Sequence, residues 1–269
     1  MSPFPDPETN IVQAEAPPAP PPPLAPQPVA DPPWTGWDVL KMAALALLTM
    51  IFLSVFLLAI VPQRAGNPIA ALSKNPRFII PVQILSYLVL ITFMYALVVH
   101  RYGRKFAAAV RWHWPHTHWL AFCFAGAVLA LAVQMGSSLL PIPRSLPIDK
   151  MFSDPVSAWM MAFFGVAIAP LVEELFFRGF LYPVLARRLG IVSGIALTAA
   201  VFAVVHASQL GSAWAPILIM FVVGVVFTSV RAITGSVAAS FLLHIAYNTT
   251  LFTFLYVGTS HFRHLEKLA

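Results

Sequence analysis

Long apolar runs dominate this chain and restrict what it can fold into. A helix needs about 20 apolar residues to cross a bilayer, and most of the runs reach that length. We predict helices over residues 38–61, 79–99, 118–140, 157–187, 190–206, 214–231 and 235–257, with proline or glycine at the breaks between them. The expected fold is therefore all-α: a polytopic membrane helical bundle of about seven to eight transmembrane helices.

The composition also indicates a membrane environment. Charged residues make up 10% of the chain and hydrophobic residues 59%, whereas a soluble domain carries about 25% charged residues. The net charge of +6 is spread over several loops and forms no basic cluster with interleaved aromatics, so no nucleic-acid partner is expected. We predict a multi-pass protein of the cell inner or plasma membrane, with the membrane itself as a partner.

The first 37 residues differ from the rest of the chain. They hold 13 of its 25 prolines, including Pro20 to Pro23. Proline removes backbone donors and favours an extended chain, so we predict a disordered Pro-rich tail over residues 1–37. A ligand for a proline-binding domain is the alternative interpretation. A transmembrane helical domain at 38–257 and a polar C-terminal tail at 258–269 complete the predicted organisation.

The fourth apolar run carries charges that a lipid-facing helix excludes: Glu173, Glu174 and Arg178. Each ionised group at membrane depth costs about 2.5–3.5 kcal/mol, so these groups are expected to face a protein interior. Glu174 and Arg178 stand four residues apart on one helix face, which predicts a structural ion pair. Glu173 is rotated by about 100° from Glu174 and has no partner on its own helix, which suits a general base.

Three more polar residues lie in later runs. His206 ends the fifth run, and His244 and Asn248 share one face of the seventh. Each alone is compatible with a structural role. At 1.5 Å per residue from the helix ends on one membrane side, Glu173 and His206 lie roughly 22 and 24 Å deep. His244 and Asn248 lie roughly 14 and 20 Å deep, so we expect all four side chains to converge in one intramembrane cavity.

This set of side chains suits hydrolysis in two ways. A carboxylate and an imidazole can activate a water molecule, while a second imidazole and an amide can stabilise an oxyanion. Alternatively, Glu173, His206 and His244 can hold one divalent metal such as zinc, with water in the fourth position. The chain has no His-Glu-x-x-His motif, so it lacks the helix of soluble zinc proteases. Both alternatives stay open.

Three motifs follow one another on successive predicted helices. They are Glu173-Glu174-x-x-x-Arg178, Phe202-x-x-x-His206 and His244-x-x-x-Asn248. Together they resemble the CAAX prenyl protease and bacteriocin-processing (CPBP, or Abi) family of intramembrane proteases over roughly residues 150–256.

The resemblance implies a glutamate- or metal-dependent intramembrane endopeptidase. Glu173 is then the water-activating carboxylate, assisted by His206. His244 and Asn248 build the oxyanion site or share in metal binding, and Glu174 and Arg178 form the structural pair. The implied substrate is a peptide or membrane-associated protein, and a prenylated C-terminus is one option.

Two other functions are compatible with the sequence. A non-catalytic membrane protein of the same fold, with an immunity or scaffold role, would use the same polar residues for structure. Intramembrane glutamate and histidine also occur in transporters, but we find no internal repeat of the kind that transporters show. We therefore expect the endopeptidase.

Overall fold

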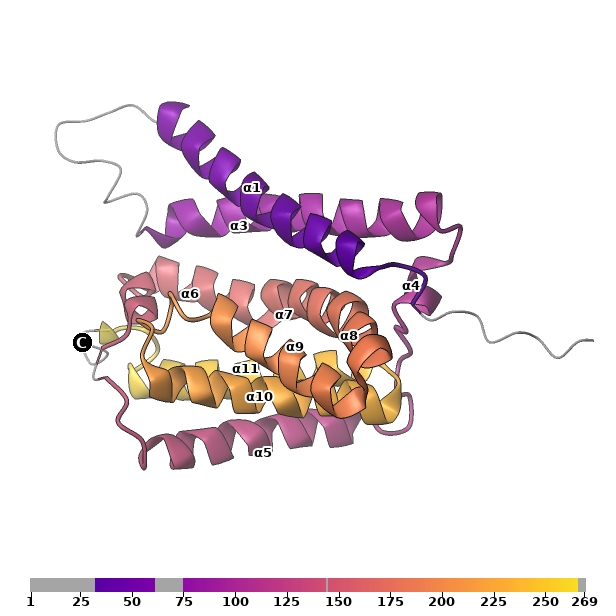
Figure 1. Cartoon of the computed structure of the whole chain (residues 1–269). Helices are drawn as coiled ribbons and strands as arrows, with labels where there is room; N and C mark the ends of the chain where they lie inside the picture. The colour runs from indigo at the N-terminus through magenta and orange to yellow at the C-terminus, as the bar shows by residue number, and fades with distance from the viewer. Residues whose placement is uncertain (1–31, 61–74, 144, 266–269) are drawn as a thin grey trace, which may run out of the picture. The chain divides into compact units, whose positions relative to one another are not determined.

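The computed structural model describes residues 32–60, 75–143 and 145–265, and the regular structure in these ranges is helical with no strand (Figure 1). The long helices are α1 (Gly36–Ile60), α3 (Pro76–Ala96), α5 (Trp119–Ser137), α6 (Pro155–Phe163), α9 (Ile191–Val205), α10 (Trp214–Thr234) and α11 (Val237–Gly258). Shorter segments are η1 (Leu97–Arg101), α4 (Phe106–Ala109), η2 (Pro147–Met151), η3 (Phe164–Ile168), α7 (Ala169–Glu173), η4 (Glu174–Leu181) and α8 (Tyr182–Leu189). The predicted disordered tail covers residues 1–37, of which 1–31 lie outside the described residues.

The prediction of an all-helical multi-pass membrane protein is confirmed. Within the described ranges, six helical stretches are long and apolar enough to cross a bilayer. One of them is continuous from α6 to the end of α8, over Pro155–Leu189. The fifth predicted run forms α9, a shorter apolar helix of 15 residues that is not one of these six stretches.

The surface of α1 suits contact with lipid. Its most apolar 18-residue window has a mean hydropathy of 2.7, and none of that window is buried inside the protein. Leu47, Leu48 and Phe52 are among its exposed side chains. Such a continuous apolar face is stable in a bilayer and would be a liability in water.

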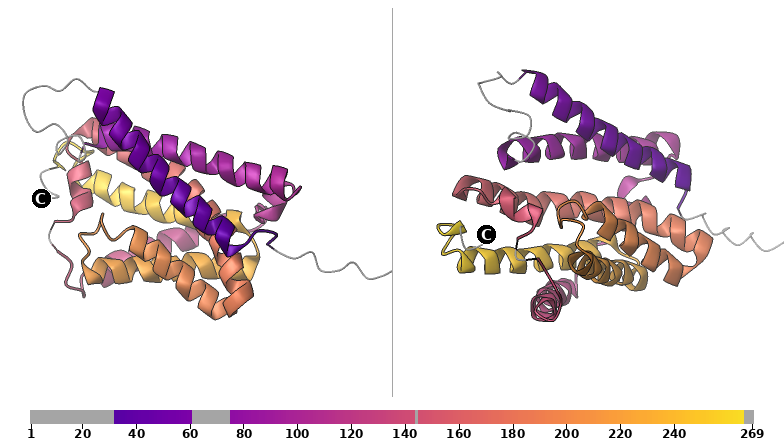
Figure 2. Two further views of the ribbon diagram at one scale, coloured as in Figure 1. Left: turned by 45° about the horizontal axis from the view of Figure 1, so that its top comes forward. Right: turned by 60° about the vertical axis from the view of Figure 1, so that its left-hand side comes forward.

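The helices of the described residues are arranged in successive layers (Figures 1 and 2). α1 packs on α3, α3 packs on α6, and the stretch from η3 to η4 packs on α11. α11 in turn packs on α5, while α9 packs between α8 and α10. The helix that carries both glutamates therefore has neighbours from both halves of the chain.

The segment just before α1 is anchored to the helices that follow. Trp34 is fully buried; its ring stacks on Phe180 at 4.3 Å between centroids, and its indole N–H donates to the Phe180 carbonyl at 3.1 Å. Arg187 donates to the carbonyls of Pro32 and Trp34. The sequence assigns residues 32–37 to the tail, whereas the structure packs Trp34 against the segment that carries Arg178.

The long helix from α6 to α8 changes its hydrogen-bonding pattern twice, at the π-helical segments η3 and η4. Pro170 and Pro183 lie close to the ends of these segments and supply no backbone N–H. Inside a membrane, π-type adjustments let the freed backbone groups find other partners. Because π segments often occur at functional sites, the placement of Glu174 and Arg178 in η4 draws attention to this region.

The close packing of α5 on α11 depends on Gly126. A Cβ atom at this position would lie 2.2 Å from the Leu243 carbonyl oxygen and 3.0 Å from the Tyr247 backbone nitrogen. Because backbone atoms cannot move aside as a flexible side chain can, the two helices would have to separate.

We therefore expect Gly126→Ala to destabilise the protein by about 1–3 kcal/mol, the usual cost of overpacking, and to lower the melting temperature by several degrees. The control is Gly136→Ala on the same helix, where an added Cβ meets nothing within 4 Å. Thermal unfolding of both variants in detergent tests this, and equal melting temperatures for the two would contradict it.

Candidate active site

The Glu174 carboxylate lies at the centre of a buried hydrogen-bond network. It is fully buried and accepts hydrogen bonds from Arg178 at 3.0 Å, from Ser240 at 2.6 Å and from His244 Nδ1 at 2.9 Å. A buried carboxylate is stable only when its charge and its lone pairs are satisfied. Glu174 therefore joins η4 to α11 through two separate contacts.

Arg178 completes the same network on the α10 side. Its guanidinium is fully buried and donates to the Thr228 hydroxyl at 3.2 Å and to the Gly224 carbonyl at 3.2 Å. It also lies 4.6 Å from the centre of the Phe202 ring, a cation–π contact that is strongest when water is excluded. The ion pair that the sequence predicts between Glu174 and Arg178 is thus present and reaches three helices.

Glu173, the adjacent residue, faces a different set of groups. One of its carboxylate oxygens lies 4.0 Å from His206 Nε2, and the other lies 3.9 Å from His244 Nε2. These distances are too long for direct hydrogen bonds and suit an intervening atom. The side chains of Glu173 and His206 are 16% and 15% exposed, so this side of the site is more accessible than the buried Glu174.

The partners of the two imidazoles determine which ring nitrogens carry hydrogen. His206 Nδ1 lies 2.7 Å from the Phe202 carbonyl oxygen, and His244 Nδ1 lies 2.9 Å from Glu174. Both partners are acceptors, so each Nδ1 donates, and in the neutral ring Nε2 is left with a lone pair. Three acceptors, one carboxylate and two Nε2 atoms, therefore converge on one region, which requires a donor or a cation between them.

Asn248 lies one turn beyond His244 on α11. Its side-chain amide donates to the Gly165 carbonyl at 2.7 Å, which connects α11 to the π-helical segment η3. One of the two amide hydrogens is used in this bond. The structure thus brings Glu173, His206 and His244 together and fixes Asn248 on the neighbouring turn.

The predicted metal set can be compared with this geometry. Neutral imidazoles that donate Nδ1–H to a carbonyl and a carboxylate are typical of zinc ligands. However, two ligands bound tetrahedrally at 2.0–2.1 Å are about 3.3 Å apart, and the distances here are 3.9 and 4.0 Å. Among the described residues, no group of three or more His, Cys, Asp or Glu side chains has the arrangement of a metal site. The zinc ligand set stays a prediction.

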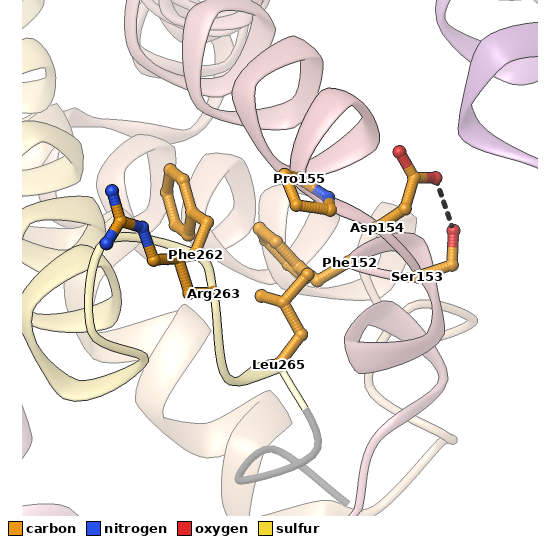
Figure 3. A pocket seen from close by; sticks show the side chains of 7 residues that line it. All are labelled: Phe152, Ser153, Asp154, Pro155, Phe262, Arg263 and Leu265. Atoms are coloured by element: carbon orange, nitrogen blue, oxygen red, sulfur yellow. Dashed lines mark hydrogen bonds between the residues drawn. The ribbon is translucent and has the colours of Figure 1, made fainter.

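A separate pocket of about 480 Å³ contains none of these residues. It is lined by Phe152, Ser153, Asp154, Pro155, Phe262, Arg263 and Leu265 (Figure 3). Asp154 caps α6 by accepting from the backbone N–H groups of Val156 and Ser157. Hydrogen bonds from the Ser157 hydroxyl and from Arg77 hold the pKa of Asp154 well below its usual range. The Asp154 carboxylate is therefore occupied in capping the N-terminus of α6.

Sequence reasoning did not identify several groups that hold the site. Ser240, Thr228 and the Gly224 carbonyl each bind Glu174 or Arg178. A signal for Ser240 was present, because Ser240, His244 and Asn248 recur every four residues on one face of α11. No comparable pattern marks Thr228, and a backbone carbonyl has no sequence signal at all.

We expect Arg178→Met to destabilise the protein by about 3–5 kcal/mol, because it leaves the Glu174 charge buried without its ion-pair partner. The matched control is Arg77→Met, which breaks an ion pair with Asp154 whose arginine side chain is 55% exposed and should change stability by about 0–1 kcal/mol. Thermal unfolding of the two variants in detergent measures their stabilities. An Arg178→Met protein as stable as Arg77→Met would contradict the role of Arg178 as the ion-pair partner of Glu174.

Comparison with known proteins points to the same region of the chain. Residues 155–250 match the sequence model of the Rce1-like type II CAAX prenyl endopeptidases. The matched range begins at α6 and includes all three motifs. No significant match was found among curated proteins or solved structures. The match confirms the resemblance that the motifs indicated: residues 155–250 of this membrane protein are similar to the Rce1-like type II CAAX prenyl endopeptidases.

Proposed function

We propose that this protein is an intramembrane endopeptidase in which Glu173, His206 and His244 activate a water molecule for attack on a peptide bond. The family implies endopeptidase activity in general terms. The observation that carries the proposal is the convergence of three acceptors, the Glu173 carboxylate and the two Nε2 atoms, at 3.9 and 4.0 Å. A water molecule between them can donate its hydrogens to two of the three.

Glu173 is the proposed base. As the water oxygen attacks the carbonyl carbon, one water proton moves to the Glu173 carboxylate and the carbonyl π electrons move to the carbonyl oxygen, which becomes an oxyanion. When the tetrahedral intermediate collapses, the C–N bond breaks and the proton held by Glu173 passes to the departing nitrogen. The products are a carboxylic acid and an amine, and Glu173 returns to its starting state.

The histidines and Asn248 have supporting roles in this proposal. With one water hydrogen donated to Glu173, the Nε2 lone pair of His206 or of His244 accepts the other and orients the water, while the Nδ1 atoms of the two rings are held by Phe202 and Glu174. Asn248 has one amide hydrogen beyond its bond to Gly165 and can donate it to the oxyanion. A bound zinc ion would instead polarise the water, held by Glu173 and the two Nε2 atoms.

The proposed substrate is the membrane-associated end of a protein or peptide. Glu173 lies within a helical stretch that is long and apolar enough to cross the bilayer, so a peptide bond must reach it at or near the membrane. A lipid-modified C-terminus is held at that interface by its chain. A prenylated C-terminus therefore fits the proposal, as the name of the family suggests.

We expect Glu173→Gln to lower the rate of peptide cleavage by at least about 10²-fold, the contribution of a positioned general base. The amide keeps the size of the side chain but accepts a proton poorly. The measurement is cleavage of a membrane-peptide library, read by mass spectrometry, with wild type and variant at equal concentrations.

A melting temperature within about 2 °C of wild type would show that the variant is folded. Full cleavage by folded Glu173→Gln would refute the assigned base. The absence of cleavage by the wild type across the library would favour a non-catalytic member of the family.

A further inference from the structure

The region around Glu173 and His244 has few hydrogen-bond donors for an oxyanion. In the neutral tautomer fixed by Glu174, His244 presents a lone pair and no N–H toward Glu173. Asn248 has already given one amide hydrogen to Gly165. Stabilisation of an oxyanion usually involves preorganised donors aimed at the developing charge, so a further donor near Glu173 would complete the chemistry.

α3 supplies a hydroxyl at this place from outside the matched domain. The ring of Tyr87 stacks on Phe164 with 5.8 Å between centroids and 21° between planes. Phe164 directly precedes Gly165, the partner of Asn248. Tyr87 also packs against the apolar cluster that includes Val172, which directly precedes Glu173. The ring is thus fixed between the two segments that carry the site.

Charge also connects the Tyr87 hydroxyl with Glu173. The hydroxyl interacts electrostatically with the Glu173 carboxylate, and the side chain of Gln83, one turn earlier on α3, hydrogen-bonds to it. When the phenol oxygen accepts from the Gln83 amide, its own hydrogen stays free to donate.

We infer that Tyr87 is a further catalytic residue, whose hydroxyl donates a hydrogen bond to the carbonyl oxygen of the scissile peptide as negative charge develops there. Tyr87 keeps its proton throughout, so the balance of the hydrolysis is unchanged. The inference rests on the proposed function and adds a contribution from α3, which the matched residues 155–250 do not include.

The test is Tyr87→Phe in the full-length protein, with a peptide that the wild type cleaves as substrate. The variant keeps the ring that stacks on Phe164 and removes only the hydroxyl. We expect kcat to fall by about 10²-fold, as for the loss of one oxyanion donor, with KM changed by less than about twofold because the donor acts mainly in the transition state. The melting temperature should stay within about 2 °C of wild type.

The matched control is Tyr95→Phe, two turns further along α3, where the side chain is 51% exposed. It should leave kcat unchanged. A Tyr87→Phe protein with kcat within about threefold of wild type would overturn the inference. Glu173→Gln in the same assay separates the two claims: if it is inactive while Tyr87→Phe is active, only the role of Tyr87 is wrong. If Glu173→Gln is also active, the proposed function itself is wrong.

Discussion

The buried Glu174 carboxylate is the interaction on which the rest of the site depends. Its three donors come from η4 and α11, and its partner Arg178 extends the network to α10. Placing a charge in this environment is unfavourable unless every donor is present. The network therefore fixes the positions of three helices relative to one another, and it also fixes the hydrogen on His244 Nδ1.

Two adjacent glutamates consequently have different tasks. Glu174 is fully buried and saturated with hydrogen bonds, whereas Glu173 is partly exposed and has neighbours only at 3.9 and 4.0 Å. A rotation of about 100° around the helix separates the structural carboxylate of Glu174 from the proposed base, Glu173. The link between them is His244, whose two ring nitrogens face the two glutamates, so the structural network orients the imidazole that faces Glu173.

Much of the fold could be predicted from the sequence because apolar runs in a membrane protein have a single solution, the helix. The predicted run at 118–140 became Trp119–Ser137, and the run at 235–257 became Val237–Gly258. The proximity of Glu173, His206 and His244 could be predicted by counting residues from the helix ends, because each residue advances the helix by about 1.5 Å into the membrane. The helix ends were less predictable: α9 is only 15 residues long, and apolar composition does not say where a helix stops.

The remaining features depend on tertiary contacts that leave little trace in the sequence. Trp34 follows a proline-rich segment and looks like part of it, yet its ring and N–H are both engaged by Phe180. Tyr87 lies in an ordinary apolar run, and only packing on Phe164 brings it to the site. The hydrogen-bonding pattern of η4 and the Gly224 carbonyl that binds Arg178 are likewise properties of the folded backbone.

We propose that the side chains of Glu173, His206 and His244 activate the water without a bound metal ion. Metal content and cleavage rate measured on the same chelator-treated, detergent-purified samples test it most directly. We expect cleavage to persist when the protein holds far less than one metal ion per chain. Cleavage that disappears with a stoichiometric metal ion and returns when zinc is added back would contradict it, and would make Glu173, His206 and His244 metal ligands.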